Sequence, residues 1–499
     1  MKSSSATAER APFVTTIHPM RRIFSFPAML ASLFSALAVI TVRMRFDDPD
    51  MWWHLKMGEL IWTTHTIPRT DLFSFTTNHH RYIPHEWLSQ FVIYGAYKAG
   101  GYLGLMALLC ILASVLLIAG YCLCWLYSGN AKISFVGGLI IWMFSTMGLA
   151  IRPQVFGYIF LIVELILLHL GRTRNARWFW GLPVLFAIWV NTHGSFFLGL
   201  LVAGVVLASS FFHFQAGLLV SPPWDPGVRR TLTYAFLLSI AALFLNPIGP
   251  SQVLYPIDTL LHQPLGLSAV DEWKPLSFSD SRAFALVAVI AASLLMVTVR
   301  WQELLWEELL ILAMGTWLAA SHERMVFAFG ILAAPILTRL LKNEWEDYDV
   351  HRDHPIANAV LIVASFIAIY FAFPSKSELT SLVATQSPVK AVEFLKSKHI
   401  SGPMLNEYVY GGYLIWAAPE YPVFIDGRAD VFEATGVFSE FGNWATLQEP
   451  PTELLDKYKI NFCLLARSSP MVQVLPLAGW TMVYSDDNSA VFLRGVPKT

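Results

Sequence analysis

The sequence predicts a mainly α-helical, polytopic membrane protein with a small α/β domain at its C-terminal end. Hydrophobic residues make up 55% of the 499 residues and charged residues only 14%, whereas a soluble protein of this size is about one quarter charged. Apolar runs of roughly 16–25 residues, the length that a bilayer-spanning helix needs, recur along the chain. They stop near Ser375, after which shorter helical and strand patterns alternate.

The apolar runs predict about eleven transmembrane helices. They cover residues 23–42, 102–127, 132–149, 154–170, 178–191, 195–213, 231–247, 283–299, 304–320, 325–341 and 356–373. Tryptophan and tyrosine often stand at their ends, as in the aromatic belts of membrane interfaces. Several runs are shorter than the roughly 20 residues of a straight crossing, so polar turns would extend them or two of them would be re-entrant.

Basic residues indicate the orientation of these helices. The segments "MRR", "GRTRNAR", "VRR" and "VRW" all fall on one side of the predicted bundle, and lysine and arginine in short loops favour the cytoplasm. We therefore expect residues 1–22 to form a cytoplasmic tail and residues 23–374 to form the membrane domain, with a large first outer loop at 43–101. An odd number of spans makes the domain at 375–499 extracytoplasmic.

The C-terminal domain shows mixed α/β patterning. "SPVKAVEFLKSK" and "TELLDKY" are typical of helices, and "YPVFIDGR", "NFCLLAR", "WTMVYSDD" and "SAVFLRG" are typical of strands.

Concentrated polar motifs lie on the predicted outer side. They are "DDPDMWWH" and "PHEWLSQ" in the first loop, the turns "IRPQ", "VNTHGS" and "SHERM", and the loop with "NPIGP" and "DEWKP". The basic loops of the opposite side are otherwise plain, so the asymmetry predicts a catalytic or binding surface that faces outward. The net charge of −1 gives no indication of nucleic-acid binding.

The acidic stretch after the first apolar run is the sharpest of these motifs. Asp47, Asp48 and Asp50 stand next to Trp52 and Trp53, and Pro49 stiffens the chain between two of the acids. A carboxylate kept partly dry by such rings is suited to act as a general base. The alternative is a solvated helix end in which the tryptophans anchor the chain at the interface.

These motifs together resemble the GT-C superfamily of multi-pass membrane glycosyltransferases. The likeness rests on "DPDMWWHLKMGELI", "HEWLSQ", "RPQVFGY", "WVNTHGSFFLG", "LNPIGP", "DEWKP" and "VFIDGRAD", which are similar to a group of bacterial members. The Asp48-Pro49 pair is placed as in the oligosaccharyltransferase branch.

The resemblance implies a protein of the bacterial inner membrane that transfers a sugar, with inversion, from a polyprenyl-phosphate-linked donor. The acceptor would be a hydroxyl of a glycan, lipid or protein. The resemblance gives the catalytic role to Asp48 or Asp50, with Asp48 preferred.

Basic side chains at short outer turns are candidates for binding the phosphate of the donor. Arg152, Arg324 and His193 occupy such turns, and the planar guanidinium matches phosphate oxygens. The alternative is an arginine paired with Glu323 or an aspartate, which would hold helix ends together.

Two further groups complete the candidate site. His54, His85 and Glu86 belong to the first loop, and the last two with an aspartate have the ligand types of a divalent metal site; "HEW" is equally typical of a helix start with an interfacial anchor. In the outer domain, Asp426 and Arg428 follow a predicted strand, where contact with the acceptor competes with simple turn chemistry. The sequence predicts no certain cofactor and leaves a metal undecided.

Two other functions fit the composition. A transporter or flippase of a lipid-linked sugar would carry polar residues at mid-span and an internal repeat, whereas here only Glu164 stands out within a run. A catalytically inactive, sugar-binding assembly partner would keep the same pocket.

Overall fold

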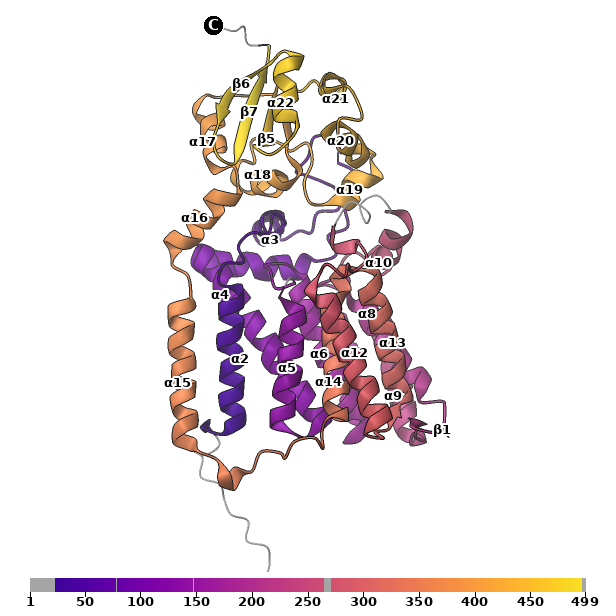
Figure 1. Ribbon diagram of the computed structural model, residues 1–499. Helices are drawn as coiled ribbons and strands as arrows, with labels where there is room; N and C mark the ends of the chain where they lie inside the picture. The colour runs from indigo at the N-terminus through magenta and orange to yellow at the C-terminus, as the bar shows by residue number, and fades with distance from the viewer. Residues whose placement is uncertain (1–22, 78, 147, 264–270, 496–499) are drawn as a thin grey trace, which may run out of the picture.

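Helices that stand side by side build most of the chain, and the C-terminal domain sits at one end of them in the computed structural model (Figure 1). The structure describes residues 23–77, 79–146, 148–263 and 271–495, so the predicted tail at 1–22 lies outside the described residues. The fold is mostly helical with a small C-terminal sheet domain, as the sequence predicts.

Each predicted span overlaps a helix of the bundle. These are α2 (Phe26–Val42), the second part of α4 (Trp87–Ser128), α5 (Ala131–Ser145), α6 (Gln154–Thr173), α7 (Gly181–Trp189), α8 (Phe196–Ser209), α9 (Pro226–Ala242), α12 (Ser281–Val299), α13 (Trp306–Ser321), α14 (Val326–Leu340) and α15 (Pro355–Ala372). Within the described residues, four of them (α4, α6, α12 and α15) are long and apolar enough to cross a membrane by themselves. The count of about eleven spans stays a prediction.

Polar caps fix where several of these helices begin. Ser25, Asn130, Asp225 and Asp280 each accept hydrogen bonds from backbone N–H groups of the first helical turn. Such groups have no partner inside the helix, and a short polar side chain supplies one.

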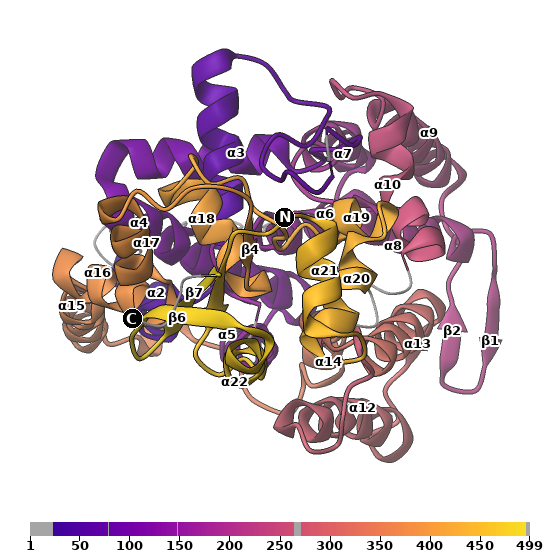
Figure 2. The ribbon, with the colours of Figure 1, turned by 90° about the horizontal axis from the view of Figure 1, so that it is seen from above.

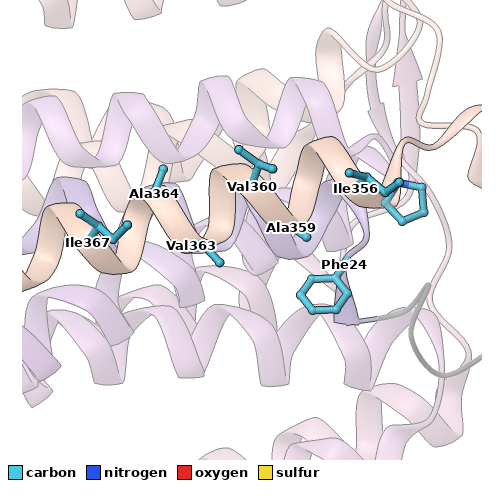
Figure 3. A pocket seen from close by; sticks show the side chains of 8 residues that line it. Phe24, Ile356, Ala359, Val360, Val363, Ala364 and Ile367 are labelled. Carbon is cyan, nitrogen blue, oxygen red and sulfur yellow. The ribbon is translucent and has the colours of Figure 1, made fainter.

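Burial differs sharply between two helices of the bundle. Helix α14 is buried on almost all sides, whereas α15 contacts α2 and exposes most of its other face, with Ile356 84% exposed. An apolar groove of about 580 Å³ runs along α15 beside Phe24 (Figure 3). Such a face suits contact with lipid chains.

The first outer loop lies across the upper end of the bundle in Figure 1. It contains α3 (Met51–Thr64) and the first part of α4, which bends at Gly101. Gly101 has φ of 58° inside the helix, a conformation that glycine adopts without a steric cost. The predicted span at 102–127 therefore begins at this bend.

The C-terminal domain, which we call the outer domain after its predicted side of the membrane, contains one four-stranded sheet and several short helices. Its elements are α16 (Lys376–Gln386), α17 (Val389–Ser397), β4 (Met404–Asn406), α18 (Gly411–Ala417), α19 (Ala429–Ala434), α20 (Val437–Ala445), α21 (Pro451–Lys457), β5 (Phe462–Ala466), α22 (Met471–Val474), β6 (Trp480–Ser485) and β7 (Ser489–Arg494). The strand order is β4-β5-β7-β6, with β4 parallel to β5 and the other pairs antiparallel.

One strand predicted for this domain is wrong. In "YPVFIDGR" only Val423 forms a bridge, and its partner is Ser74 of the first outer loop rather than a strand of the sheet. The apolar run is buried because it lies between the loop and the sheet domain. Burial alone does not distinguish such a segment from a core strand.

Two smaller features complete the fold. Strands β1 (Phe214–Ala216), β2 (Leu219–Ser221) and β3 (Leu304–Leu305) form a second sheet at the end of the bundle away from the outer domain (Figure 1). Helix α10 (Pro250–His262) lies below α19 of the outer domain in Figure 1, and the two overlap in the view from above (Figure 2).

Candidate functional site

The Asp48-Pro49-Asp50 segment connects α2 to α3 at the end of the bundle that lies next to the C-terminal domain. The N–H of Asp50 donates to Oδ1 of Asp48 at 2.9 Å, which closes a local turn. The indole Nε1 of Trp53, one turn into α3, donates to Oδ1 of Asp50 at 3.1 Å. Asp48 is buried, Asp50 is half-buried and Asp47 is exposed. The two acids therefore point inward, and their neighbour Asp47 does not.

Arg152, just before α6, joins these two carboxylates to a third. Its Nε contacts Oδ2 of Asp48, and its Nη2 lies 3.1 Å from Oδ2 of Asp50. Its Nη1 lies 3.1 Å from Oε1 of Glu272, whose side chain is 42% exposed. Three acids surround one guanidinium, so this part of the site carries a net negative charge. Arg152 thus pairs with aspartates, as the alternative interpretation has it.

The protonation of Asp48 depends on its burial. Loss of water raises the pKa of this carboxyl to about 6, with Arg152 lowering it and Asp50 raising it. A carboxylate with such a pKa is ionised at neutral pH and is basic enough to accept a proton.

Three histidines surround Glu86 immediately beside this cluster. Nδ1 of His54 lies 3.8 Å from Oε2 of Glu86, and Nε2 of His85 and Nε2 of His193 lie 3.6 and 3.5 Å from Oε1. These groups belong to three motifs that are separate in the sequence, and the structure brings the three histidines to one carboxylate. The charge of Arg152 lowers the pKa of His54, so the two clusters are close enough to interact.

The hydrogen bonds around the histidines distinguish their protonation states. Nδ1 of His193 accepts from the N–H of Ser195 at 3.1 Å, which leaves Nε2–H to face Glu86. Nδ1 of His85 faces the carbonyl oxygen of Ile83 at 3.2 Å, and its Nε2 faces Glu86, so both ring nitrogens have only acceptors as neighbours.

The pKa values agree with these bonds. Burial lowers the pKa of His54 and of His193 to about 3, although Glu86 opposes it. For His85, burial is outweighed by Glu86, and its pKa is raised. One imidazolium and two neutral imidazoles therefore share the Glu86 carboxylate, whose own pKa is held below its usual range, above all by His85 against the effect of burial.

Arg324 is the basic group of the site without a carboxylate partner among the described residues. Its guanidinium lies over the ring of Trp273, with 5.5 Å from Cζ to the ring centre. Its neighbour Glu323 pairs instead with Arg282. The side chain of Arg324 is half-buried, and its charge contributes to lowering the pKa of His193, after burial.

Asp426 and Arg428 occupy a sealed cluster rather than an open strand end. Nε and Nη2 of Arg428 bind the two oxygens of Asp426 at 2.8 and 2.5 Å, and Nη1 binds Oδ1 of Asp71 at 2.5 Å. The three side chains are at most 1% exposed. The ion pair between Arg428 and Asp71 joins the outer domain to the first loop. Because the three side chains are shut off from solvent, an acceptor has no room between them.

Two acids in these clusters were not among the candidates from the sequence. Glu272 of "DEWKP" pairs with Arg152, and Asp71 of "RTDLFSF" pairs with Arg428 in the sealed cluster. Asp430, which follows Asp426 and Arg428 at the predicted strand end, accepts from the Tyr255 hydroxyl at 3.2 Å. The ring of Tyr255 stacks on His85 with 3.9 Å between centres. Glu272 could have been found because it lies in "DEWKP", a polar motif on the predicted outer side. Nothing in the sequence spacing indicates that it pairs with Arg152.

A metal site was left undecided by the sequence. Within the part of the chain that the structure describes, no group of three or more histidine, cysteine, aspartate or glutamate side chains is arranged to hold a metal ion. Between Asp48 and Asp50 the guanidinium of Arg152 takes the place in which a cation would sit.

A helix bundle with a small α/β domain at one end is also the fold of solved membrane glycosyltransferases. The oligosaccharyltransferase of Archaeoglobus fulgidus, tethered with an acceptor peptide, matches 95% of this chain and 75% of its own, with a TM-score of 0.56 and 12% identity. The same organism's AglB in complex with an inhibitory peptide and a dolichol-phosphate matches 93% of this chain and 74% of its own, with a TM-score of 0.53 and 11% identity.

A second solved protein matches over nearly its whole length. ArnT from Cupriavidus metallidurans bound to undecaprenyl phosphate matches 92% of this chain and 97% of its own, with a TM-score of 0.51 and 10% identity. At these identities the likeness shows the fold. No protein-family model and no curated protein matches the sequence.

Proposed function

We propose that the protein is a membrane glycosyltransferase that takes a sugar from a polyprenyl-phosphate-linked donor and transfers it to an acceptor hydroxyl at the outer face of the membrane. The observation that carries the proposal is the pair Asp48 and Asp50, held inward at the end of the bundle by Arg152. The GT-C fold supports the reaction class.

Asp48 is the general base in this proposal. Its carboxylate takes the proton of the acceptor hydroxyl while the oxygen attacks the anomeric carbon of the sugar. The bond from that carbon to the phosphate oxygen breaks, and the polyprenyl phosphate leaves with the electron pair. The configuration at the anomeric carbon is inverted, and Asp48 then releases its proton to water. Asp50 acts through Asp48, because its charge raises the pKa of the Asp48 carboxyl. Arg152 keeps Asp48 and Asp50 in place, so it does not have to bind phosphate.

The leaving phosphate is assigned to Arg324. Its guanidinium has no acidic partner among the described residues, and charge-assisted bonds from arginine to phosphate are strong and planar. The pKa of His193, whose Nε2–H faces Glu86, is lowered in part by the charge of Arg324, so the phosphate would bind near the histidine cluster. The rivals remain a transporter and an inactive sugar-binding partner. Against transport, Glu164 is fully buried beside Gly199 of α8.

The test uses purified protein and a panel of polyprenyl-phosphate-linked sugars. Wild-type protein should release polyprenyl phosphate from at least one donor, and Asp48→Asn should not. Translocation of an intact donor across proteoliposomes, with no release of polyprenyl phosphate, would favour the transporter. We expect transfer to survive chelation, because Arg152 supplies the positive charge between the acids. Full loss with restoration by added metal would contradict this.

Orientation is tested separately. A reporter fused after residue 499 should be active only in a form that works outside the cytoplasm. Activity of a cytoplasmic reporter would place the acids on the wrong face of the membrane and contradict the mechanism.

A further inference from the structure

The backbone of Gly427 in the outer domain lies directly against the carboxylate of Asp50. A β-carbon built on Gly427 would fall 1.9 Å from Oδ1 and 3.1 Å from Cγ of Asp50, and 3.3 Å from Nε1 of Trp53. Gly427 is not among the described glycines with positive φ. The absence of a side chain at Gly427 therefore leaves room for the Asp50 carboxylate, whereas the backbone conformation would accept other residues.

Asp50 is enclosed on its other sides by groups of the membrane domain. Trp53 Nε1 donates to Oδ1 at 3.1 Å, and Nη2 of Arg152 lies 3.1 Å from Oδ2. Both carboxylate oxygens have a partner, and Gly427 occupies the remaining side. Three segments that are distant in the sequence thus determine where this acid points.

The segment that carries Gly427 is fixed from the outer domain and from the first loop. Asn406 of β4 donates from Nδ2 to the carbonyl of Ile425 at 2.8 Å and accepts from the N–H of Phe424 at 2.8 Å. The N–H of Val423 donates to the carbonyl of Phe73 at 3.0 Å. These bonds hold the backbone on both sides, as two neighbouring strands would.

Arg428 locks the same segment immediately after Gly427. Its bonds to Asp71 and Asp426 are sealed from water, and the rings of Phe73 and Tyr82 lie 5.0 and 5.5 Å from its guanidinium carbon. A buried charge cluster has few alternative arrangements, because breaking any pair leaves an unpaired charge in a dry place.

We propose that residues 423–428 of the outer domain form a wall of the active site that fixes the position of Asp50. Gly427 is the positioning residue that contacts Asp50, and Arg428 holds the wall in place through its ion pairs with Asp71 and Asp426. The inference rests on the proposed function, because it gives the wall a part in catalysis through Asp50. It makes the outer domain a component of the site and not a separate accessory. A side chain at 427 displaces the Asp50 carboxylate, which is the flexible partner in the contact.

A cross-link tests the contact without any assay of activity. The full-length variant with Asp50→Cys and Gly427→Cys should form a disulfide on mild oxidation, detected as a linked peptide by mass spectrometry, because the two side chains are within bonding reach. The control combines Asp50→Cys with Gly442→Cys in α20, where nothing lies within 4 Å of an added β-carbon. Absence of the 50–427 link in folded protein, or equal linking in the control, overturns the wall.

A double-mutant cycle tests its catalytic role. Gly427→Ala should lower the transfer rate by about tenfold to a hundredfold, since misplacement by about 1 Å has effects of that size. In an Asp50→Ala background, which removes the clashing carboxylate, the same substitution should cost nothing further. Gly442→Ala should leave the rate unchanged, and the thermal unfolding of the two alanine variants should be alike.

The two ways of failing are distinguishable. Losses from Gly427→Ala and Asp50→Ala that simply multiply overturn the positioning role. Full activity of Asp50→Ala, together with a formed 50–427 disulfide, contradicts the part of Asp50 in the proposed reaction while the wall itself stands.

Discussion

Two clusters of this protein have nearly the same composition, an arginine between two aspartates, and they differ in their access to water. In the cluster of Asp48, Asp50 and Arg152 the side chains are 7%, 24% and 19% exposed. In the cluster of Asp71, Asp426 and Arg428 they are at most 1% exposed. The first can meet a substrate and the second cannot. Residue types alone therefore do not distinguish a candidate reaction site from a buried structural ion-pair cluster.

The pKa values of the acids also differ between the two clusters. Burial raises the pKa of Asp48 to about 6 against the effect of Arg152. At Asp71 burial also raises the pKa, but Arg428 and the hydroxyls of Ser74 and Thr77 outweigh it and lower the pKa to about 2. Asp71 is thus stabilised as a permanent anion, whereas Asp48 is poised to exchange a proton.

The largest expected effect is that of Asp48→Asn on the transfer rate. Asparagine keeps the shape and removes the proton acceptor, and loss of a general base lowers rates by about a hundredfold to ten-thousandfold. Turnover is measured at matched membrane expression, with Asp47→Asn as the control because Asp47 is exposed. A near-normal rate for Asp48→Asn would contradict the role of Asp48 as general base and favour the alternative that the acidic stretch is only a solvated helix end.

The next effect concerns stability. Arg428→Met should lower the free energy of unfolding by about 3–5 kcal/mol, because it leaves Asp71 and Asp426 buried and unpaired. Arg152→Met should cost clearly less, since water reaches its partners. Unfolding in detergent, followed by heat or denaturant, compares the two variants. An equal loss of unfolding free energy in Arg428→Met and Arg152→Met would contradict the distinction between a buried structural cluster and an accessible site.

Arg324→Gln should weaken binding of the lipid-linked donor. Loss of a charge-assisted bond of about 1.5–3 kcal/mol corresponds to an increase of roughly tenfold to 150-fold in the KM for the lipid-linked sugar. Arg324→Lys keeps the charge and should lie between the variant and the wild type. If KM is unchanged and only stability falls, Arg324 has a structural role.

The smallest effect is the pH dependence. Because Asp48 must be ionised and its pKa lies at about 6, the rate should rise with pH and level off above this value, falling about tenfold for each pH unit below it. Asp50 contributes to raising this pKa, so Asp50→Asn should move the midpoint of its residual activity to lower pH. A profile that is flat across about pH 5–8 would contradict the assignment of Asp48.

The fold class and most helices could be predicted because they depend on local patterns. Apolar length and composition indicate membrane helices, and the strand patterns near residues 462–466, 480–485 and 489–494 appear as β5, β6 and β7. The failure at "YPVFIDGR" has a tertiary cause, since this segment pairs with the first outer loop.

The sequence by itself determined that acids, histidines and arginines gather at one end of a helical membrane protein. Only the tertiary structure decided their partners, because the deciding ion pairs join residues far apart in the chain. Asp71 and Arg428 are 357 positions apart, and no local pattern encodes such a distance. Packing likewise decided which cluster water can enter: Arg428 is sealed with its aspartates, whereas Arg152 and its aspartates remain partly exposed.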